Sequence, residues 1–184
     1  GGLLPPGKWR GGVEADVELQ SAPGQPMGMG GTLKFSKVSG RLDKPIKNEE
    51  AQVSGGFSAS GNMQFRFKEK LENLTSNLAV NLKPLTLYKK DLFFKKSGVP
   101  FNLRLKSGLK NNKIQISKFD IDLAQVKASV TGAVATKPGG KSQLTFKVPK
   151  TNLAGLEKQL LPLKKYPVKG SLAVSGNVTG DLNK

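Results

Sequence analysis

The chain has no histidine and no cysteine among its 184 residues. It therefore cannot build a zinc finger, a Ser-His-Asp triad, a cysteine nucleophile or a haem site of the usual kind. No disulfide can form, so the cysteine count says nothing about the redox compartment. These absences remove most familiar catalytic machinery. The sequence predicts a protein that is not an enzyme, with no catalytic residue, metal ligand or cofactor.

Acidic residues and long apolar runs are also scarce. The chain carries 30 Lys and Arg against 13 Asp and Glu, a formal net charge of +17. This excess predicts an anionic partner or a soluble, self-repelling surface. No stretch approaches the roughly 20 apolar residues that cross a bilayer. The start at Gly1 has no signal-peptide pattern, and we interpret the chain as a fragment of a longer protein.

The sequence does contain a strong period of two. Apolar residues alternate with polar ones from Val13 to Leu19, and the pattern recurs at 33–35, 63–67, 74–82, 101–105, 114–116, 119–123, 128–130, 144–148 and 172–174. Such alternation is typical of strands with one apolar and one wet face. Gly, Pro, Ser and Asn clusters separate these segments, and residues 110–113 have the composition of a tight hairpin turn. Nine to eleven short strands therefore predict a mainly β fold.

One segment departs from this period. Its leucines have the spacing of one helical face, at Leu153, Leu156, Leu160 and Leu161. Thr151 or Asn152 is a suitable N-cap, and Pro162 ends the pattern. The sequence thus predicts one short amphipathic helix at 152–161 in an otherwise mainly β chain.

The apolar strand faces are the first candidate site. A second sheet would close them into an ordinary core, whereas a curved sheet would leave an apolar groove. Strands of about seven residues would be ~23 Å long, comparable with an extended acyl chain. The candidates for the groove wall are Phe35, Phe65, Phe67, Leu103, Leu105, Ile114, Ile116, Ile121, Leu123, Leu144 and Phe146.

The basic residues are the second candidate site, because many alternate with the apolar ones and so fall on the wet face. Nucleic acid, phospholipid headgroups and lipopolysaccharide phosphates are all anionic partners for such a face. A base-stacking platform needs aromatic and basic side chains together, which the alternation does not provide, so nucleic acid is not favoured. The doublets Lys89-Lys90 and Lys95-Lys96 add to this basic surface.

Two carboxylates, Asp120 and Asp122, also fall on the wet face. Paired carboxylates can perform acid–base chemistry. The neighbouring Lys118 and Lys127 instead predict ordinary surface ion pairs.

The two ends of the chain show a weak internal repeat. Residues 3–17 match residues 160–174 at five of fifteen positions, including Leu3-Leu4-Pro5 against Leu160-Leu161-Pro162. Such a match is typical of repeat arrays. We therefore interpret 1–184 as a single β-groove segment, with 1–12 and 160–184 as candidate ends of neighbouring repeat units.

The segment from Leu85 to Leu161 carries a distinctive succession of elements. A strand at Leu85-Thr86-Leu87 is followed by Lys96-Ser97-Gly98-Val99-Pro100 and by the alternating strand from Phe101 to Lys106. Later come the strand 144–148, the leucine-rich 152–162 and a glycine-punctuated strand at 170–180. On these elements the chain resembles the AsmA-like superfamily of Gram-negative envelope proteins, which includes the TamB- and YhdP-type proteins.

The resemblance implies a function and a location. It implies a curved antiparallel sheet folded into a taco-like groove, with one short amphipathic helix. This sheet would be one segment of a long periplasmic β-groove, tethered to the inner membrane by a helix outside this chain. Such grooves carry phospholipids towards the outer membrane and support envelope integrity, which makes acyl chains the expected partners. Anionic lipid or lipopolysaccharide headgroups would suit the basic face. Two alternatives stay open: a basic nucleic-acid-binding β module, and an envelope scaffold that binds proteins through a sheet edge.

Overall fold

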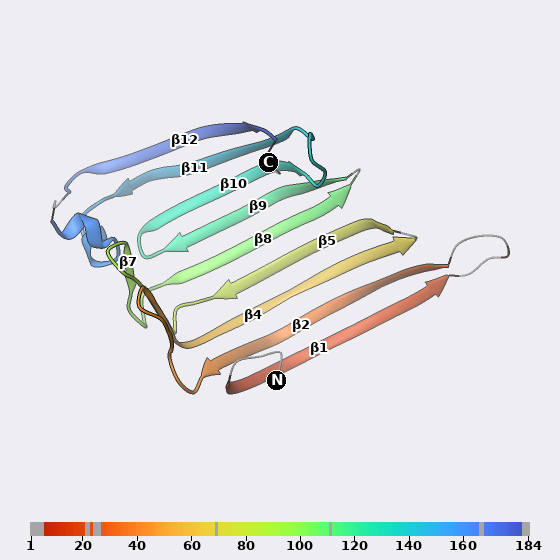
Figure 1. Cartoon of the computed structure of the whole chain (residues 1–184), viewed down its shortest axis with the longest axis horizontal. Coiled ribbons are helices and arrows are strands. Elements are labelled where there is room, and N and C mark those ends of the chain that lie inside the picture. Colours follow the sequence, from red (N-terminus) through yellow and green to blue (C-terminus); the bar gives the residue numbers. More distant parts are fainter. Residues whose placement is uncertain are drawn as a thin grey trace.

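The computed structural model describes residues 6–20, 23, 27–68, 70–110, 112–165 and 168–181. Nine antiparallel strands in these ranges form one continuous main sheet, in the order β1-β2-β4-β5-β8-β9-β10-β11-β12 (Figure 1). Their bounds are Gly7–Gln20, Gly28–Leu42, Ala51–Lys68, Lys70–Asn81, Phe101–Lys110, Lys113–Leu123, Val126–Ala135, Ser142–Asn152 and Ser171–Gly180. The prediction of a mainly β, curved antiparallel sheet is confirmed. These strands, of 10 to 18 residues, are longer than the expected seven.

Three short strands stand outside this order and form a side sheet with the first part of β4. Residues 51–55 of β4 pair with β3 (Ile46–Lys47) on one side and β6 (Leu85–Lys89) on the other, and β6 pairs with β7 (Phe93–Lys95). β4 changes direction at Gly55, which has φ +94°, and a Cβ there would lie 2.4 Å from the carbonyl oxygen of Pro84. Only glycine fits this corner without strain.

The prediction of an amphipathic α-helix at 152–161 is wrong. The segment instead contains two short 3₁₀ turns, η1 (Leu156–Lys158) and η2 (Leu161–Lys164). Between them Leu160 is extended and forms a β-bridge with Phe93. Two backbone hydrogen bonds, Phe94 N–H to Gln159 O at 2.7 Å and Leu161 N–H to Leu92 O at 3.1 Å, tie the segment to β7. Tertiary pairing with the edge of the side sheet therefore overrides the helical leucine spacing.

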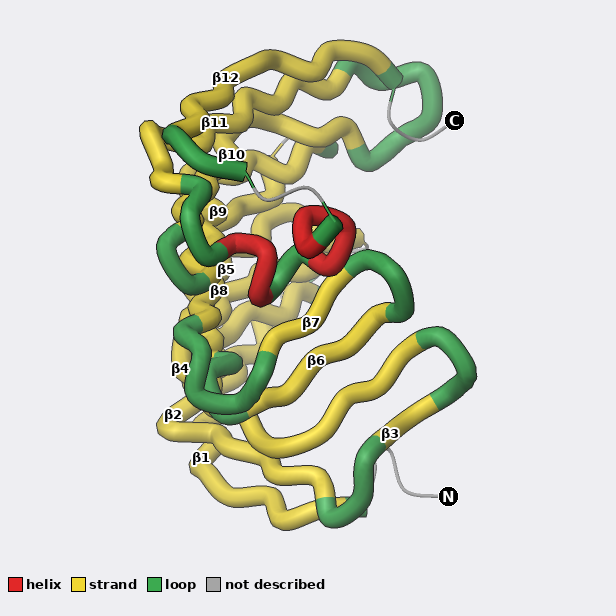
Figure 2. Tube along the Cα trace, turned by 90° about the vertical axis from the view of Figure 1, so that its left-hand side faces the viewer, coloured by secondary structure: helices red, strands yellow, loops and turns green. Residues whose placement is uncertain are grey.

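The main sheet is curved, and one end of its concave side is occupied. Figure 2 looks along the strands and shows the sheet from β1 to β12, with β3, β6, β7 and the 3₁₀ turns across the near end of the concave side. A hydrogen bond from Gln125 Nε2 to Ala154 O joins the 3₁₀ segment to the β9–β10 turn at 3.0 Å. The sheet is thus obstructed at one end of its strands.

The fold has almost no conventional core. The chain exposes 12734 Å², whereas a compact monomer of 19.7 kDa exposes about 8,600 Å². In the described ranges the buried apolar side chains are Leu85, Ala135 and Leu156. A surface this large is that of a single-layered sheet, so the closed-core alternative does not describe this fold.

Several smaller expectations can be placed on the structure. The hairpin predicted at 110–113 joins β8 to β9, with Lys110 paired to Lys113 and Asn112 in the left-handed region at φ +55°. Leu3, Leu4, Pro5 and Tyr166 lie outside the described residues. The internal repeat and the domain ends that depend on it therefore stay predictions.

Gly132 offers a direct test of how tightly the strands are packed. Its φ is +134°, and a Cβ there would lie 2.1 Å from the carbonyl oxygen of Gln143 on β11. We expect Gly132→Ala to destabilise the sheet by about 2–4 kcal/mol, because positive φ and backbone overlap both oppose the methyl group. Urea denaturation followed by circular dichroism measures this loss. Gly139→Ala is a control for the φ effect, since Gly139 also has positive φ but no atom within 4 Å of its added Cβ.

Candidate functional site

All eleven residues predicted for the groove wall lie on one face of the main sheet. The strand register sets Phe65 beside Gly31 and Leu74, Leu105 beside Leu78 and Phe119, and Phe146 beside Val130 and Gly176. We call this surface the apolar face. It comprises Phe35, Phe65, Phe67, Leu103, Leu105, Ile114, Ile116, Ile121, Leu123, Leu144 and Phe146, and further apolar residues of the nine strands, among them Trp9, Val13, Val17, Leu19, Met29, Leu33, Phe57, Met63, Leu74, Leu78, Val80, Phe119, Val130 and Val178.

Irregularities in the register keep this face continuous. In β9 the apolar spacing slips from two to three between Ile116 and Phe119. The register also shifts there, since Lys106 pairs with Lys118 but Ser107 pairs with Ile116, which leaves Ser117 as an extra residue. A β-bulge of this kind absorbs one residue and returns the next side chain to the same face. Similar shifts occur in the β1–β2, β4–β5 and β11–β12 pairings.

Aromatic rings on this face lie over glycines of adjacent strands. A Cβ at Gly176 would lie 2.6 Å from the Phe146 ring, and one at Gly31 would lie 3.2 Å from Phe65. At the obstructed end Trp9 and Phe57 make an edge-to-face contact, with centroids 5.8 Å apart, over Gly40. The rings therefore lie down against the backbone, which gives a smooth apolar surface and half-buries the rings without a second layer.

Exposure varies along the apolar face. The most exposed members lie on the two edge strands or at the end of the sheet away from the side sheet, including Leu19 at 67% and Leu172 at 47%. At the side-sheet end Trp9, Phe57 and Val80 are half-buried. The apolar face is thus accessible along its two rims and at one end.

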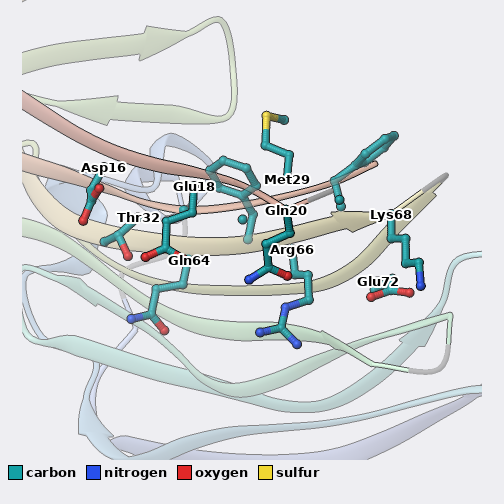
Figure 3. A pocket seen from close by; sticks show the side chains of 14 residues that line it. Asp16, Glu18, Gln20, Met29, Thr32, Gln64, Arg66, Lys68 and Glu72 are labelled. Atoms are coloured by element: carbon teal, nitrogen blue, oxygen red, sulfur yellow. The ribbon is translucent and has the colours of Figure 1, made fainter. Parts of the chain in front are cut away.

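The apolar and polar side chains leave the sheet on opposite sides. In Figure 3 Met29 projects to the side on which the β6–β7 hairpin lies, whereas Asp16, Glu18, Gln64 and Arg66 project to the other side. The apolar face therefore lies on the side that carries the side sheet, which Figure 2 shows to be the concave one. The polar side chains form the outer face.

One polar pair interrupts the apolar face near its centre. The hydroxyls of Ser76 on β5 and Ser107 on β8 are 2.7 Å apart and hydrogen-bonded to each other. One hydroxyl donates to the other, so the pair adds less polarity to the surrounding surface than two separate hydroxyls would.

The outer face carries charges of both signs. Asp120 pairs with Lys118 at 3.1 Å and Asp122 pairs with Arg104 at 3.1 Å, while Lys127 lies opposite Asp122 in the register. The predicted surface ion pairing of the two carboxylates is confirmed, with Arg104 as the partner that the sequence did not suggest. Exposed pairs of this kind contribute about 0–1 kcal/mol each.

One residue of the predicted basic surface is not on the surface. Lys95 is fully buried, and its Nζ donates hydrogen bonds to the carbonyl oxygens of Leu85 at 2.6 Å, Lys83 at 3.1 Å and Lys96 at 3.4 Å. The Lys95 ammonium links β7 to the start of β6. No local pattern indicates this role, because a Lys-Lys doublet is most often solvated.

Metal-binding clusters and membrane-spanning helices are both missing from the described part of the chain. It contains no group of three or more acidic side chains placed to hold a metal ion. No helix within it has the length and apolarity to cross a membrane. Comparison of the chain with protein-family models, with curated proteins and with solved structures finds no match.

Proposed function

We propose that this chain is one segment of a lipid-conducting β-groove, in which the apolar face binds phospholipid acyl chains. The observation that carries the proposal is a nine-stranded apolar face that the side sheet and the 3₁₀ turns cover at one end only. Monomeric proteins rarely expose contiguous apolar patches larger than a few hundred Å². A surface of this extent therefore favours an apolar ligand.

Acyl chains fit this surface on physical grounds. Each methylene shielded from water contributes about 0.8 kcal/mol, so a lipid lying on the apolar face is stabilised along its whole length. The aromatic rings lie flat against glycines of adjacent strands and leave few obstacles to sliding. Headgroups would remain in water at the rims formed by β1 and β12. No chemical step is needed for a lipid to move along such a surface.

The proposed setting derives from the resemblance to AsmA-like proteins. We propose that the segment lies in the periplasm of a Gram-negative cell, tethered to the inner membrane by a part of the protein outside this chain. There it would support phospholipid transport between the inner and outer membranes and thereby envelope integrity.

A nucleic-acid-binding module is supported less well. The seven phenylalanines of the main sheet all lie on the apolar face, away from the lysines and arginines of the outer face. Base stacking therefore cannot be combined with phosphate contacts on one face. Binding to a mixed-sequence oligonucleotide at about 50 mM salt, with a steep salt dependence, would favour this alternative.

Lipid extraction tests the proposed function. The chain is expressed with export to the periplasm, purified without detergent, extracted with organic solvent and analysed by mass spectrometry. We expect phospholipids to co-purify in amounts close to or above one molecule per chain. A folded preparation that carries no lipid and takes up none from vesicles would contradict the proposal.

A further inference from the structure

The outer edge of β1 is a free edge of the main sheet. Among the described strands β1 pairs with β2 alone, and Figure 1 shows it at the margin of the sheet. Every residue of the strand is exposed except Gly7 and Trp9. Two of its apolar side chains, Val13 at 62% and Val17 at 48%, are among the most exposed of the apolar face. The edge therefore presents unpaired backbone groups and apolar surface to which another strand can bind.

The charged side chains of β1 are ordered by sign along the strand. Alternate residues share a face, so the even-numbered positions all lie on the outer face, opposite Trp9 and Val13. Basic residues occupy the first half of the strand and acidic residues the second half, namely Lys8, Arg10, Glu14, Asp16 and Glu18. A strand with this order carries a positive end and a negative end.

Four of these five charges have no ion-pair partner among the described residues. Glu14 pairs with Lys34 of β2 at 3.4 Å, but the other four belong to none of the described ion pairs. The residues of β2 opposite Lys8, Arg10, Asp16 and Glu18 are, in that order, Arg41, Ser39, Thr32 and Gly30. The neighbouring strand therefore sets no opposite charge across from any of the four.

A second β1 that runs antiparallel along this edge would match these charges. Opposite residues of an antiparallel pair share a face. With a twofold axis between the two copies of Val13, residues at equal distances before and after Val13 lie opposite each other. Lys8 then lies opposite Glu18, and Arg10 lies opposite Asp16. By symmetry each of these ion pairs forms twice, so the strand is complementary to itself.

The apolar side chains match in the same register. Trp9 lies opposite Val17, and Val13 lies opposite its own copy, all on the apolar face. Glu14 lies opposite Gly12 and keeps its partner in β2.

The neighbouring registers fit less well. An axis at Glu14 sets this carboxylate against its own copy, and like charges directly opposite each other are destabilising. An axis at Gly12 sets Arg10 opposite Glu14, which already has a partner, and leaves Glu18 with no residue of β1 opposite. Charged edge strands ordinarily prevent pairing between copies. In the register centred on Val13, however, opposite signs meet.

We infer that β1 binds the β1 of a second copy of this chain, antiparallel and with a twofold axis at Val13. Each copy uses the same patch, which is the isologous contact of a symmetric dimer. Backbone hydrogen bonds supply the affinity, and the paired charges select the register. The two main sheets become one sheet with both apolar faces on the same side, bounded by the two β12 edges. The inference goes beyond the proposed function and does not depend on lipid binding.

Single-cysteine crosslinking tests the contact and its register. The chain has no cysteine, so each variant carries one thiol per copy. Val13→Cys places the two thiols directly opposite each other, with Cα atoms about 4.5–5.5 Å apart, within the range of a disulfide. Val17→Cys is the matched control, because its two copies would lie roughly 27 Å apart along the strands.

Mild oxidation of the purified variants is followed by electrophoresis without reducing agent. We expect at least about fivefold more disulfide-linked dimer for Val13→Cys than for Val17→Cys. Equal yields at the two positions would contradict the register. Dimer at neither position would leave this edge to another partner. Either result would overturn the inference.

A charge-swap experiment tests the ion pairs. Lys8→Glu with Arg10→Glu makes β1 wholly acidic, and Asp16→Lys with Glu18→Lys makes it wholly basic. The four side chains are exposed, so both variants are expected to fold, and circular dichroism checks this. Sedimentation velocity over a concentration series measures self-association. We expect the dissociation constant of each variant alone to be at least roughly tenfold weaker than that of the unaltered chain.

An equimolar mixture of the acidic and basic variants is expected to regain the dimer, because all the charges of the register centred on Val13 match again. A mixture as monomeric as its components would overturn the inference, whatever the result of lipid extraction. So would an unaltered chain that stays monomeric at every concentration.

Discussion

Replacing Leu105 with glutamate is expected to remove bound phospholipid from the protein. Leu105 lies near the centre of the apolar face, on β8 between Leu78 of β5 and Phe119 of β9. A carboxylate there must either stay ionised against acyl chains or take up a proton, and both cost several kcal/mol. We expect Leu105→Glu to reduce co-purifying phospholipid by at least about fivefold, measured by quantitative lipid mass spectrometry.

The matched control for this substitution is the next residue of the same strand. Lys106→Glu adds the same side chain on the outer face, where Lys106 lies opposite Lys118. It is expected to retain lipid, because acyl chains on the apolar face do not reach the outer face. Thermal unfolding of both variants separates loss of lipid from loss of fold. Equal lipid content in Leu105→Glu, Lys106→Glu and the wild type would be evidence against an acyl-chain site on this face.

Replacing Lys95 with alanine is expected to cause a large loss of stability. Its buried stem and its hydrogen bonds to Leu85 O, Lys83 O and Lys96 O hold β7 to the start of β6. Lys95→Ala removes three buried methylenes, at about 0.8 kcal/mol each, and leaves carbonyls without their donor, at about 1–3 kcal/mol. We expect Lys95→Ala to lower the free energy of unfolding by about 3–5 kcal/mol, with the destabilisation concentrated in the side sheet.

Hydrogen exchange shows where this loss falls. Amides of β6 and β7 are expected to lose protection in Lys95→Ala, while those of β9 and β10 keep theirs. Lys95→Met keeps most of the stem and is expected to lose about half as much stability, since only the hydrogen bonds disappear. Lys96→Ala is the control, because Lys96 is exposed. A stability of Lys95→Ala equal to that of Lys96→Ala would refute this role for Lys95.

Burial also makes the contribution of Lys95 to folding stability depend on pH. Desolvation lowers the pKa of the Lys95 ammonium below its ordinary value. The unfolded chain therefore keeps this proton to higher pH than the folded chain, so stability rises with pH between the lowered pKa and the ordinary one. The stability deficit of Lys95→Met relative to the wild type should accordingly widen between neutral pH and about pH 10 in urea titrations. A stability deficit of Lys95→Met that narrows as the pH rises would contradict a lowered pKa of Lys95.

The sequence predicted the apolar face well because the signal is local. Alternation determines which side chains share a face, and Phe65, Leu105 and Phe146 needed only their own strands to be assigned correctly. The apolar spacing changes from two residues to three between Ile116 and Phe119, yet both side chains lie on the predicted face. The β-bulge at Ser117 absorbs the extra residue. The single layer was also foreseeable as one of two alternatives, since one short covering segment cannot bury so many strands.

Features that depend on distant contacts were not predictable. The helix at 152–161 failed because Leu160 pairs with Phe93, a partner about 70 residues earlier in the chain. The buried position of Lys95 depends on the corner that β4 makes at Gly55.

Site-specific photo-crosslinking along β8 tests the acyl-chain site on the apolar face most directly. The photoreactive residue p-benzoylphenylalanine is placed, one position at a time, at Asn102, Leu103, Arg104, Leu105 and Lys106 of the chain expressed in the periplasm. After irradiation, crosslinked phospholipid is detected by mass spectrometry of the purified chain. We expect crosslinks at Leu103 and Leu105 and none at the other three positions, because β8 turns alternate side chains to the apolar and outer faces. Crosslinks of equal yield at all five positions, or at none, would contradict an acyl-chain site on this face.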